Sequence, residues 1–328
     1  MAWSLFFSQL LNGLQLGLLL FLLAAGLTLI FGIMDFINLS HGAFYMIGAY
    51  FCAAVAMASG SLLAGIALGL IGVFVVGALV EWLMVRKLYR RDHLDHVLIT
   101  FGLMLVMDGL VHMIWGPAGM AVALPEALTG QVEFGGVVLP VYRLVIVLGG
   151  LAVAALLYLL VTRTRLGMRI RAGAANRQMI EALGVNIDRL FLVVFALGAA
   201  LAGFAGMLIA PITEASIGMG NDIIIIAFVV VIVGGIGSVK GAFYAALIIG
   251  MIDTMGRAYL DDVLQWAMRD QFAETVAPAL SAMLVYLLMA TVLAVKPQGL
   301  FPPAGARCRC GAAGVDCRRR ARGAFIWR

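Results

Sequence analysis

Residues 9–33 read QLLNGLQLGLLLFLLAAGLTLIFGI, a stretch of 25 residues without a single charged side chain. About 20 apolar residues of helix cross the hydrocarbon layer of a bilayer, where an isolated segment must satisfy its own backbone hydrogen bonds. This stretch therefore predicts a membrane-spanning helix. Eight further apolar stretches follow, at 41–58, 61–85, 96–115, 142–162, 189–210, 222–239, 241–258 and 275–295.

The composition of the 328 residues indicates the same environment. Hydrophobic residues make up 64% and charged residues 12%, whereas soluble domains average about half apolar and about a quarter charged. Because so little polar surface is available, soluble enzymes and nucleic-acid-binding proteins are excluded. We expect an all-α, polytopic integral membrane protein with eight or nine transmembrane helices, in which one of the first three stretches is a candidate for a broken or re-entrant segment.

Positive charge is concentrated at the C-terminus. Residues 302–328 contain seven Arg and one acid, Asp316, against a net charge of +5 for the whole chain. We expect residues 1–301 to form the membrane domain and 302–328 to form a basic, disordered cytoplasmic tail. The alternative for residues 304–328, given the abrupt change in their composition, is a frameshifted or non-homologous end. Three of the four Cys lie in this tail and Cys52 lies in an apolar stretch, so the pattern predicts neither a disulfide framework nor a metal site.

Basic residues follow three of the apolar stretches, at 86–91, at 163–177 and from Lys296 onward. Two stretches separate the first and second basic segments, and four separate the second and third. Both numbers are even, so all three segments fall on one side of the membrane. Cytoplasmic loops carry the excess of Lys and Arg, which predicts a cytoplasmic C-terminus.

Four polar residues, Asp35, Asn38, Ser40 and His41, interrupt the first apolar stretches. Polar groups are costly in lipid and tend to face a bundle interior or water. These residues are therefore candidates for the translocation path, as a structural element without a catalytic role. The alternative is a turn between two helices, in which Asn38 or Ser40 caps the following helix.

Two further groups of ionisable residues have two interpretations each. Asp108 and His112 lie one helical turn apart, which indicates either a hydrogen-bonded or ionic pair between helices or a proton relay. Residues 92–96 contain two Asp and two His, but they adjoin a basic segment. We expect a solvated turn there rather than a metal site.

The loop at 163–189 is the longest polar segment of the membrane domain. Ala175, Met179 and Leu183 repeat at i, i+4 and i+8 with Ile180 beside them, which predicts a short amphipathic helix over 172–183. Gly184 is expected to end it, and Asn186 or Asp188 to cap the next helix. Such a helix either lies on the membrane surface or docks into a groove of a cytoplasmic partner.

The sequence has no Gly-x4-Gly-Lys-Ser/Thr phosphate-binding loop. The nearest text, residues 234–241, has Val239 where that loop needs the Gly before its Lys, and it predicts a tight turn between two membrane helices. We therefore expect a chain that is not an enzyme and that binds no cofactor.

Several segments resemble a known family. Residues 26–50, from Gly26 to Tyr50, closely resemble the N-terminal signature of the LivH-type permeases of bacterial branched-chain amino acid ABC importers. The loop 167–190, the Gly-Gly-Ile-Gly-Ser run at 234–238 and the Lys-Pro-Gln-Gly-Leu-Phe run at 296–301 are also similar to that family. The resemblance covers residues 5–301, and the family usually ends where the basic tail begins.

The resemblance implies a multi-pass subunit of the bacterial inner membrane that works as a heterodimer with a related permease. Two cytoplasmic ATPase subunits, which use the ATP, and a periplasmic solute-binding protein would complete the importer. The solute would be leucine, isoleucine or valine, or a related amino acid or amide. Residues 172–184 would be the coupling helix that contacts the ATPase, through Ala175, Asn176, Met179, Ile180, Glu181, Leu183 and Gly184.

A second hypothesis is an ion-coupled secondary transporter of a small solute. In that case Asp35, His41 or Asp108 would carry the coupling ion, and the chain would transport without an ATPase. The two hypotheses differ in whether the isolated chain moves solute down an ion gradient.

Overall fold

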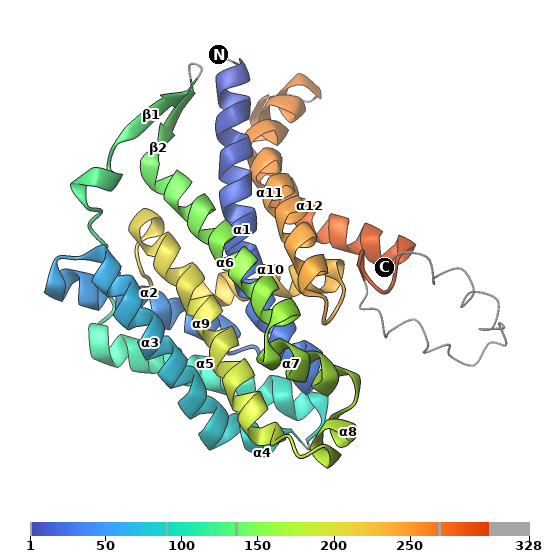
Figure 1. Ribbon diagram of the computed structural model, residues 1–328. Coiled ribbons are helices and arrows are strands. Elements are labelled where there is room, and N and C mark those ends of the chain that lie inside the picture. The colour runs from blue at the N-terminus through green and yellow to red at the C-terminus, as the bar shows by residue number, and fades with distance from the viewer. Residues whose placement is uncertain (1, 90, 135–136, 268–269, 302–328) are drawn as a thin grey trace.

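The protein is a bundle of α-helices (Figure 1). The computed structural model describes residues 2–89, 91–134, 137–267 and 270–301, and the basic tail expected at 302–328 lies outside these ranges. Within them, the strands are β1 (Gln131–Phe134) and β2 (Val137–Pro140), which form an antiparallel hairpin with Val132 opposite Leu139. The helices are α1 (Ala2–Met34), α2 (His41–Ser59), α3 (Leu62–Val80), the π-helical η1 (Glu81–Val85), α4 (Arg86–Leu88), α5 (His93–Trp115), the 3₁₀ turn η2 (Glu126–Leu128), α6 (Val141–Arg163), α7 (Arg165–Ala175), α8 (Arg177–Ala182), α9 (Ile187–Thr213), α10 (Met219–Gly234), α11 (Val239–Ala267) and α12 (Asp270–Val295).

All nine apolar stretches form helices, and the expected all-α, polytopic membrane fold is confirmed. Two apolar helical segments, Met219–Gly234 and the Ala279–Val295 part of α12, are shorter than 18 residues. Seven helices in the described part of the chain are long and apolar enough to cross a membrane: Leu5–Met34, His41–Ser59, Leu62–Leu88, His93–Trp115, Val141–Arg163, Ile187–Thr213 and Val239–Leu260.

The stretch expected to be helical over 222–239 ends earlier than the sequence indicates. Helix α10 stops at Gly234, because Gly235 (φ +101°) and Gly237 (φ +82°) adopt conformations that side-chain-bearing residues avoid. Helix α11 then begins at Val239. The tight turn expected at 234–241 is confirmed, and the predicted helix end was five residues too late.

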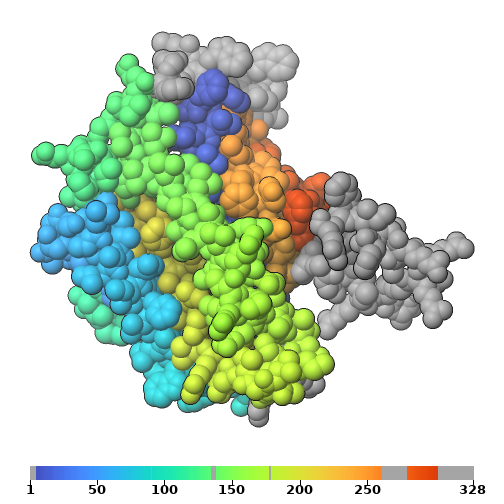
Figure 2. Space-filling view, viewed as in Figure 1, coloured from blue at the N-terminus to red at the C-terminus, as the bar shows by residue number. Residues whose placement is uncertain are grey.

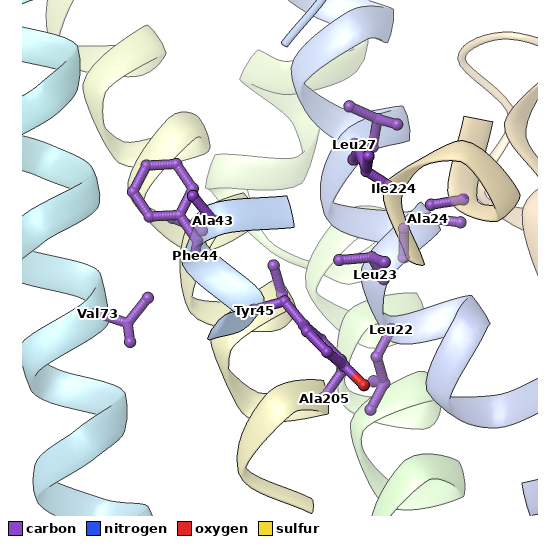
Figure 3. Close-up of a cluster of buried hydrophobic side chains, with 14 of the residues drawn as sticks. Leu22, Leu23, Ala24, Leu27, Ala43, Phe44, Tyr45, Val73, Ala205 and Ile224 are labelled. Carbon is purple, nitrogen blue, oxygen red and sulfur yellow. The ribbon is translucent and has the colours of Figure 1, made fainter. Parts of the chain in front are cut away.

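Helix α1 is the centre of the bundle and packs against α6, α7, α9, α10 and α11. Its middle turns are apolar on all sides, and Leu18, Leu22, Leu23 and Ile30 are fully buried, as expected of a helix enclosed by others. Figure 3 shows Leu22 and Leu23 of α1 facing Tyr45 of α2.

Close approach between helix backbones depends on glycine. An added Cβ on Gly48 of α2 would lie 2.3 Å from the carbonyl oxygen of Gly203 on α9, and one on Gly206 would lie 1.9 Å from that of Tyr45. Small residues allow such contacts between membrane helices. The α2–α9 crossing therefore requires glycine at these positions.

The two ends of the bundle differ in character. Helices α4, α7 and α8 lie at one end, and the β-hairpin and the N-terminus lie at the other (Figure 1). The turn at Gly237 lies at the same end as α4, α7 and α8. It is close to the end of α1, since a Cβ added to Gly32 would lie 3.1 Å from Gly237 Cα. The backbone N–H of Phe301 in turn donates to Gly234 O. The described residues of the three basic segments, which for the third are residues 296–301, therefore gather at this end, which we call the basic end.

Candidate functional site

At the basic end, α6 and α7 are joined by a rigid corner. The Thr164 hydroxyl oxygen accepts a hydrogen bond from the Gly167 N–H at 3.0 Å and so caps α7. An added Cβ on Gly167 would lie 2.3 Å from the carbonyl oxygens of Leu160 and Val161. The Arg171 guanidinium also donates to the Val161 carbonyl. These contacts join the start of α7 directly to the last turn of α6.

The single helix expected over 172–183 is wrong, since the structure has two helices that meet at Asn176. This residue is extended (φ −159°, ψ 106°), so it ends α7. Its side-chain oxygen accepts from the Met179 N–H at 3.0 Å, so it also caps α8. Asn favours helix caps over helix interiors, because its side chain bonds to nearby backbone groups. The spacing of apolar residues contains no information on this preference, so it predicted one continuous helix.

The apolar residues of α8 point in two directions. Ile180 is 4% exposed and packs into the protein, whereas Met179 is 62% exposed and Leu183 is 76% exposed. Ala175 and Glu181 are also exposed. The sequence groups Met179 with Ile180, but of Met179, Ile180 and Leu183 only Met179 and Leu183 present apolar surface outward.

A Schellman motif ends α8. The Val185 N–H donates to Ile180 O and the Gly184 N–H donates to Glu181 O, with Gly184 in the left-handed region (φ +83°). The expected stop at Gly184 is confirmed. Asn186 then caps α9 by accepting from the Arg189 N–H at 3.0 Å, as one of the two expected capping residues.

Beside this turn, α7 and α9 border a groove of about 340 Å³. The groove is lined by Arg169 of α7 and Arg189 of α9, both exposed, together with Leu166 and Leu190. A docking surface at this end would therefore combine exposed apolar side chains with guanidinium groups.

Helix α7 also contacts the transmembrane core. An added Cβ on Gly173 would lie 3.6 Å from both Ile33 of α1 and Leu190 of α9. Ile170, one turn earlier, is 4% exposed. Helix α7 therefore packs directly against the central helix α1 and against α9.

The connection between α1 and α2 turns back into the bundle. His41, the first residue of α2, places Nε2 at 3.1 Å from the Leu23 carbonyl oxygen. Leu23 precedes the end of α1 at Met34 by about 16 Å of helix. Helix α2 therefore begins deep inside the bundle, which agrees with a re-entrant segment among the first three stretches.

Three of the four path candidates are buried in this junction. Asn38, Ser40 and His41 are 0% exposed. The Ser40 hydroxyl donates to Asn38 Oδ1 at 2.6 Å and does not cap α2, although Ser40 stands at the N-cap position. The Leu39 N–H donates to the hydroxyl of Thr100 on α5 at 3.1 Å. The junction is thus held by its own side chains and by α5.

The fourth candidate, Asp35, lies at the surface of the basic end. Its carboxylate is 4.0 Å from His93 Nε2, and both side chains are more than half exposed. The solvated turn expected at 92–96 is wrong for His96, which is 4% exposed. The His96 ring packs 4.6 Å from that of Phe36, and its Nε2 lies 2.9 Å from Leu88 O.

Asp108 forms a hydrogen bond between helices, but not with the partner that sequence spacing indicates. Asn221, in the first turn of α10, donates to Asp108 Oδ2 at 3.1 Å. His112 is exposed. The expected interhelical pair is therefore present with Asn221 in place of His112.

Sequence reasoning did not identify the polar cluster around Glu81. This carboxylate is fully buried and accepts from the Tyr89 hydroxyl at 2.7 Å and from the Arg86 guanidinium at 3.3 Å. Burial and then the hydrogen bond to Glu81 raise the pKa of the Tyr89 hydroxyl well above its usual value, so this hydroxyl remains the proton donor. The sequence feature that could have identified this cluster is a single acid, Glu81, near the end of a long apolar stretch and followed by Arg86 and Tyr89.

Two known proteins are similar to this chain over nearly their whole length. The chain is 30% identical over 315 residues to the high-affinity branched-chain amino acid transport system permease protein LivH of Escherichia coli K12. The aligned residues cover 89% of this chain and 96% of LivH. It is 31% identical over 310 residues to the corresponding permease protein BraD of Pseudomonas aeruginosa, with 90% and 95% covered.

A more distant similarity extends to sugar transport. The xylose transport system permease protein XylH of Escherichia coli K12 is 32% identical over 167 residues, which cover 46% of this chain and 40% of XylH. No solved structure matches the chain. Residues 9–293 match the family described as branched-chain amino acid transport system / permease component, and the chain belongs to this family.

Proposed function

We propose that this chain is the membrane-spanning permease subunit of an ATP-driven ABC importer for leucine, isoleucine, valine or related small amino acids and amides. The family match and the names of two relatives that align over nearly their whole length support this function. The partial similarity to a xylose permease involves less than half of the chain, so it supports the transport class and not a sugar as solute.

The proposed importer contains a second, homologous permease subunit, two cytoplasmic ATPase subunits and a periplasmic solute-binding protein. ATP is bound and hydrolysed by the ATPase subunits. The chain lies in the bacterial inner membrane with its basic end and C-terminus in the cytoplasm, because Lys and Arg collect on that side.

One observation carries the assignment of the ATPase-docking surface. Met179 and Leu183, which are 62% and 76% exposed, stand on a short capped helix at the basic end and outside the apolar span helices. Exposed apolar groups in a polar setting are typical of partner contacts. We define the docking surface as Ala175, Asn176, Met179, Glu181, Leu183 and Gly184. Ile180 anchors it from below.

The transmission route follows from the contacts of α7. The ATPase pair would move α8 when it closes on ATP, and α7 would carry this movement into α1 and α9 through Gly173, Ile33 and Leu190. Tightly packed helices shift as rigid elements. The bundle would thereby alternate between states open to either side of the membrane.

The junction at residues 38–41 is proposed as the element of the chain that adjoins the translocation path. Asn38 Nδ2 and His41 Nδ1 are buried without a hydrogen-bonding protein group. Leaving such groups unsatisfied costs about 1–3 kcal/mol each, so their retention is consistent with a second state in which they meet the solute or water. Asp35 would then mark the cytoplasmic mouth.

Co-purification of the ATPase tests the docking surface. Two fully buried apolar side chains contribute about 1.5–3 kcal/mol each to an interface, so the double variant Met179→Asp, Leu183→Asp should lose at least tenfold in affinity for the ATPase. The matched control is Met179→Leu, Leu183→Met, which keeps the apolar area and should retain the ATPase. Recovery of the ATPase with the Asp variant at the wild-type level would show that the partner binds elsewhere.

A further inference from the structure

A second groove lies on the flank of the bundle, away from α8. Its volume is about 490 Å³, and α1, α6 and α11 form its walls. Figure 2 shows α1, in blue, between the green α6 and the orange α11. Leu151 and Ala155 of α6 and Phe21 and Phe243 of the other two helices supply apolar surface.

A single cation stands at one end of this groove. Lys240, the second residue of α11, is exposed and lies 5.6 Å from the centre of the Tyr158 ring, in the range of a cation–π contact. In the described part of the chain Lys240 forms no ion pair, and the residues that line the groove include no acid. An anionic group is therefore the complementary occupant at this position.

The groove is polar at the basic end and apolar toward the middle of the bundle. Tyr158 precedes the end of α6 at Arg163 by five residues, about 7 Å of helix. Leu151 lies about 10 Å deeper along the same helix. Phe21 and Phe243 pack edge to face at 5.1 Å in the floor. A ligand that fits must carry its negative charge near the membrane surface and apolar chains below it.

We propose that this groove binds an anionic phospholipid of the leaflet at the basic end. The phosphate diester would lie against Lys240, with Tyr158 and Tyr244, each about half exposed, beside the headgroup. One acyl chain would lie along α6 toward Leu151. Basic pockets between transmembrane helices on the cytoplasmic side are typical sites for anionic headgroups.

Native mass spectrometry of the delipidated, fully assembled complex tests the site. The probes are phosphatidylglycerol and phosphatidylethanolamine with identical acyl chains. We expect wild type to bind phosphatidylglycerol more tightly. Lys240→Gln should weaken phosphatidylglycerol binding about fivefold and leave phosphatidylethanolamine unchanged, because one Lys near the surface contributes about that factor. The matched control is Lys87→Gln, which removes an exposed charge of the same basic end outside the groove and should change binding less than twofold.

A second variant separates charge from shape. Ala155→Trp fills the groove from an exposed position and should weaken both lipids while the complex stays assembled. Equal effects of Lys240→Gln and Lys87→Gln would overturn the proposal. So would displacement of the lipid by millimolar inorganic phosphate, or a disulfide from Ala155→Cys to the second permease subunit, which would show that protein covers the groove.

Discussion

Gly48→Ala changes a single hydrogen to a methyl group at the crossing of α2 and α9. The new Cβ would lie 2.3 Å from Gly203 O and 2.4 Å from Gly203 Cα. Real Cβ contacts are not shorter than 3.0 Å, so one backbone must move by at least about 0.7 Å. Because the obstacle is backbone and not a flexible side chain, no rotamer change relieves it.

The expected cost follows from this geometry. Inserting an extra methyl group into a packed core costs about 1–3 kcal/mol, and a backbone obstacle favours the upper value. Replacing Gly by Ala within a helix returns up to about 1 kcal/mol. The free energy of unfolding should therefore fall by about 2 kcal/mol, which corresponds to several degrees in melting temperature.

The assay is thermal unfolding of the purified, detergent-solubilised complex, followed by the loss of its size-exclusion peak. The matched control is Gly149→Ala on α6, where an added Cβ has no atom within 4 Å. The control should melt at or slightly above wild type. A Gly48→Ala variant that melts as high as the Gly149→Ala control would refute the close crossing of α2 and α9.

Three further substitutions test other parts of the account. Asn176→Ala removes the cap of α8 at a cost of about 1 kcal/mol, so amide hydrogen exchange over 177–182 should accelerate about fivefold. The control Asn176→Asp keeps a capping oxygen and should preserve protection from exchange. Unchanged exchange in Asn176→Ala would argue against the capped helix. Arg86→Gln leaves the fully buried Glu81 carboxylate without its cation and should cost up to about 3 kcal/mol in thermal unfolding; an unchanged melting temperature would contradict the cluster. Asp108→Asn keeps a hydrogen-bonding oxygen opposite Asn221, so ATP-driven uptake should stay within twofold of wild type. A loss greater than tenfold would show that transport needs the Asp108 carboxylate itself and not only its hydrogen bond.

Much of the fold could be predicted because lipid imposes a simple rule. Each stretch of about 20 apolar residues had to become a helix, and the nine stretches did. The sequence could not show how deep in the bundle each helix begins. A helix that crosses the whole membrane and a helix that begins inside the bundle have the same hydropathy. The position of His41 beside Leu23 depends on tertiary packing alone.

The candidate site was predicted less completely, for local and tertiary reasons. The apolar repeat in 172–183 placed a helix there, but the capping preference of Asn176 divided it in two. Ile180 and Met179 differ in exposure because α8 rests on the bundle by one face. Asp108 accepts its hydrogen bond from Asn221 on α10, 113 residues away. Helical spacing indicates only neighbours on the same helix, so it could not identify this partner.

Reconstitution into proteoliposomes tests the central claim most directly, by measuring leucine uptake with ATP present on the side of the basic end. The chain together with its second permease, ATPase and binding-protein partners should show ATP-dependent uptake. The same assembly carrying Met179→Asp and Leu183→Asp should show none. Uptake by the isolated chain under a proton or sodium gradient, without any ATPase, would contradict the account.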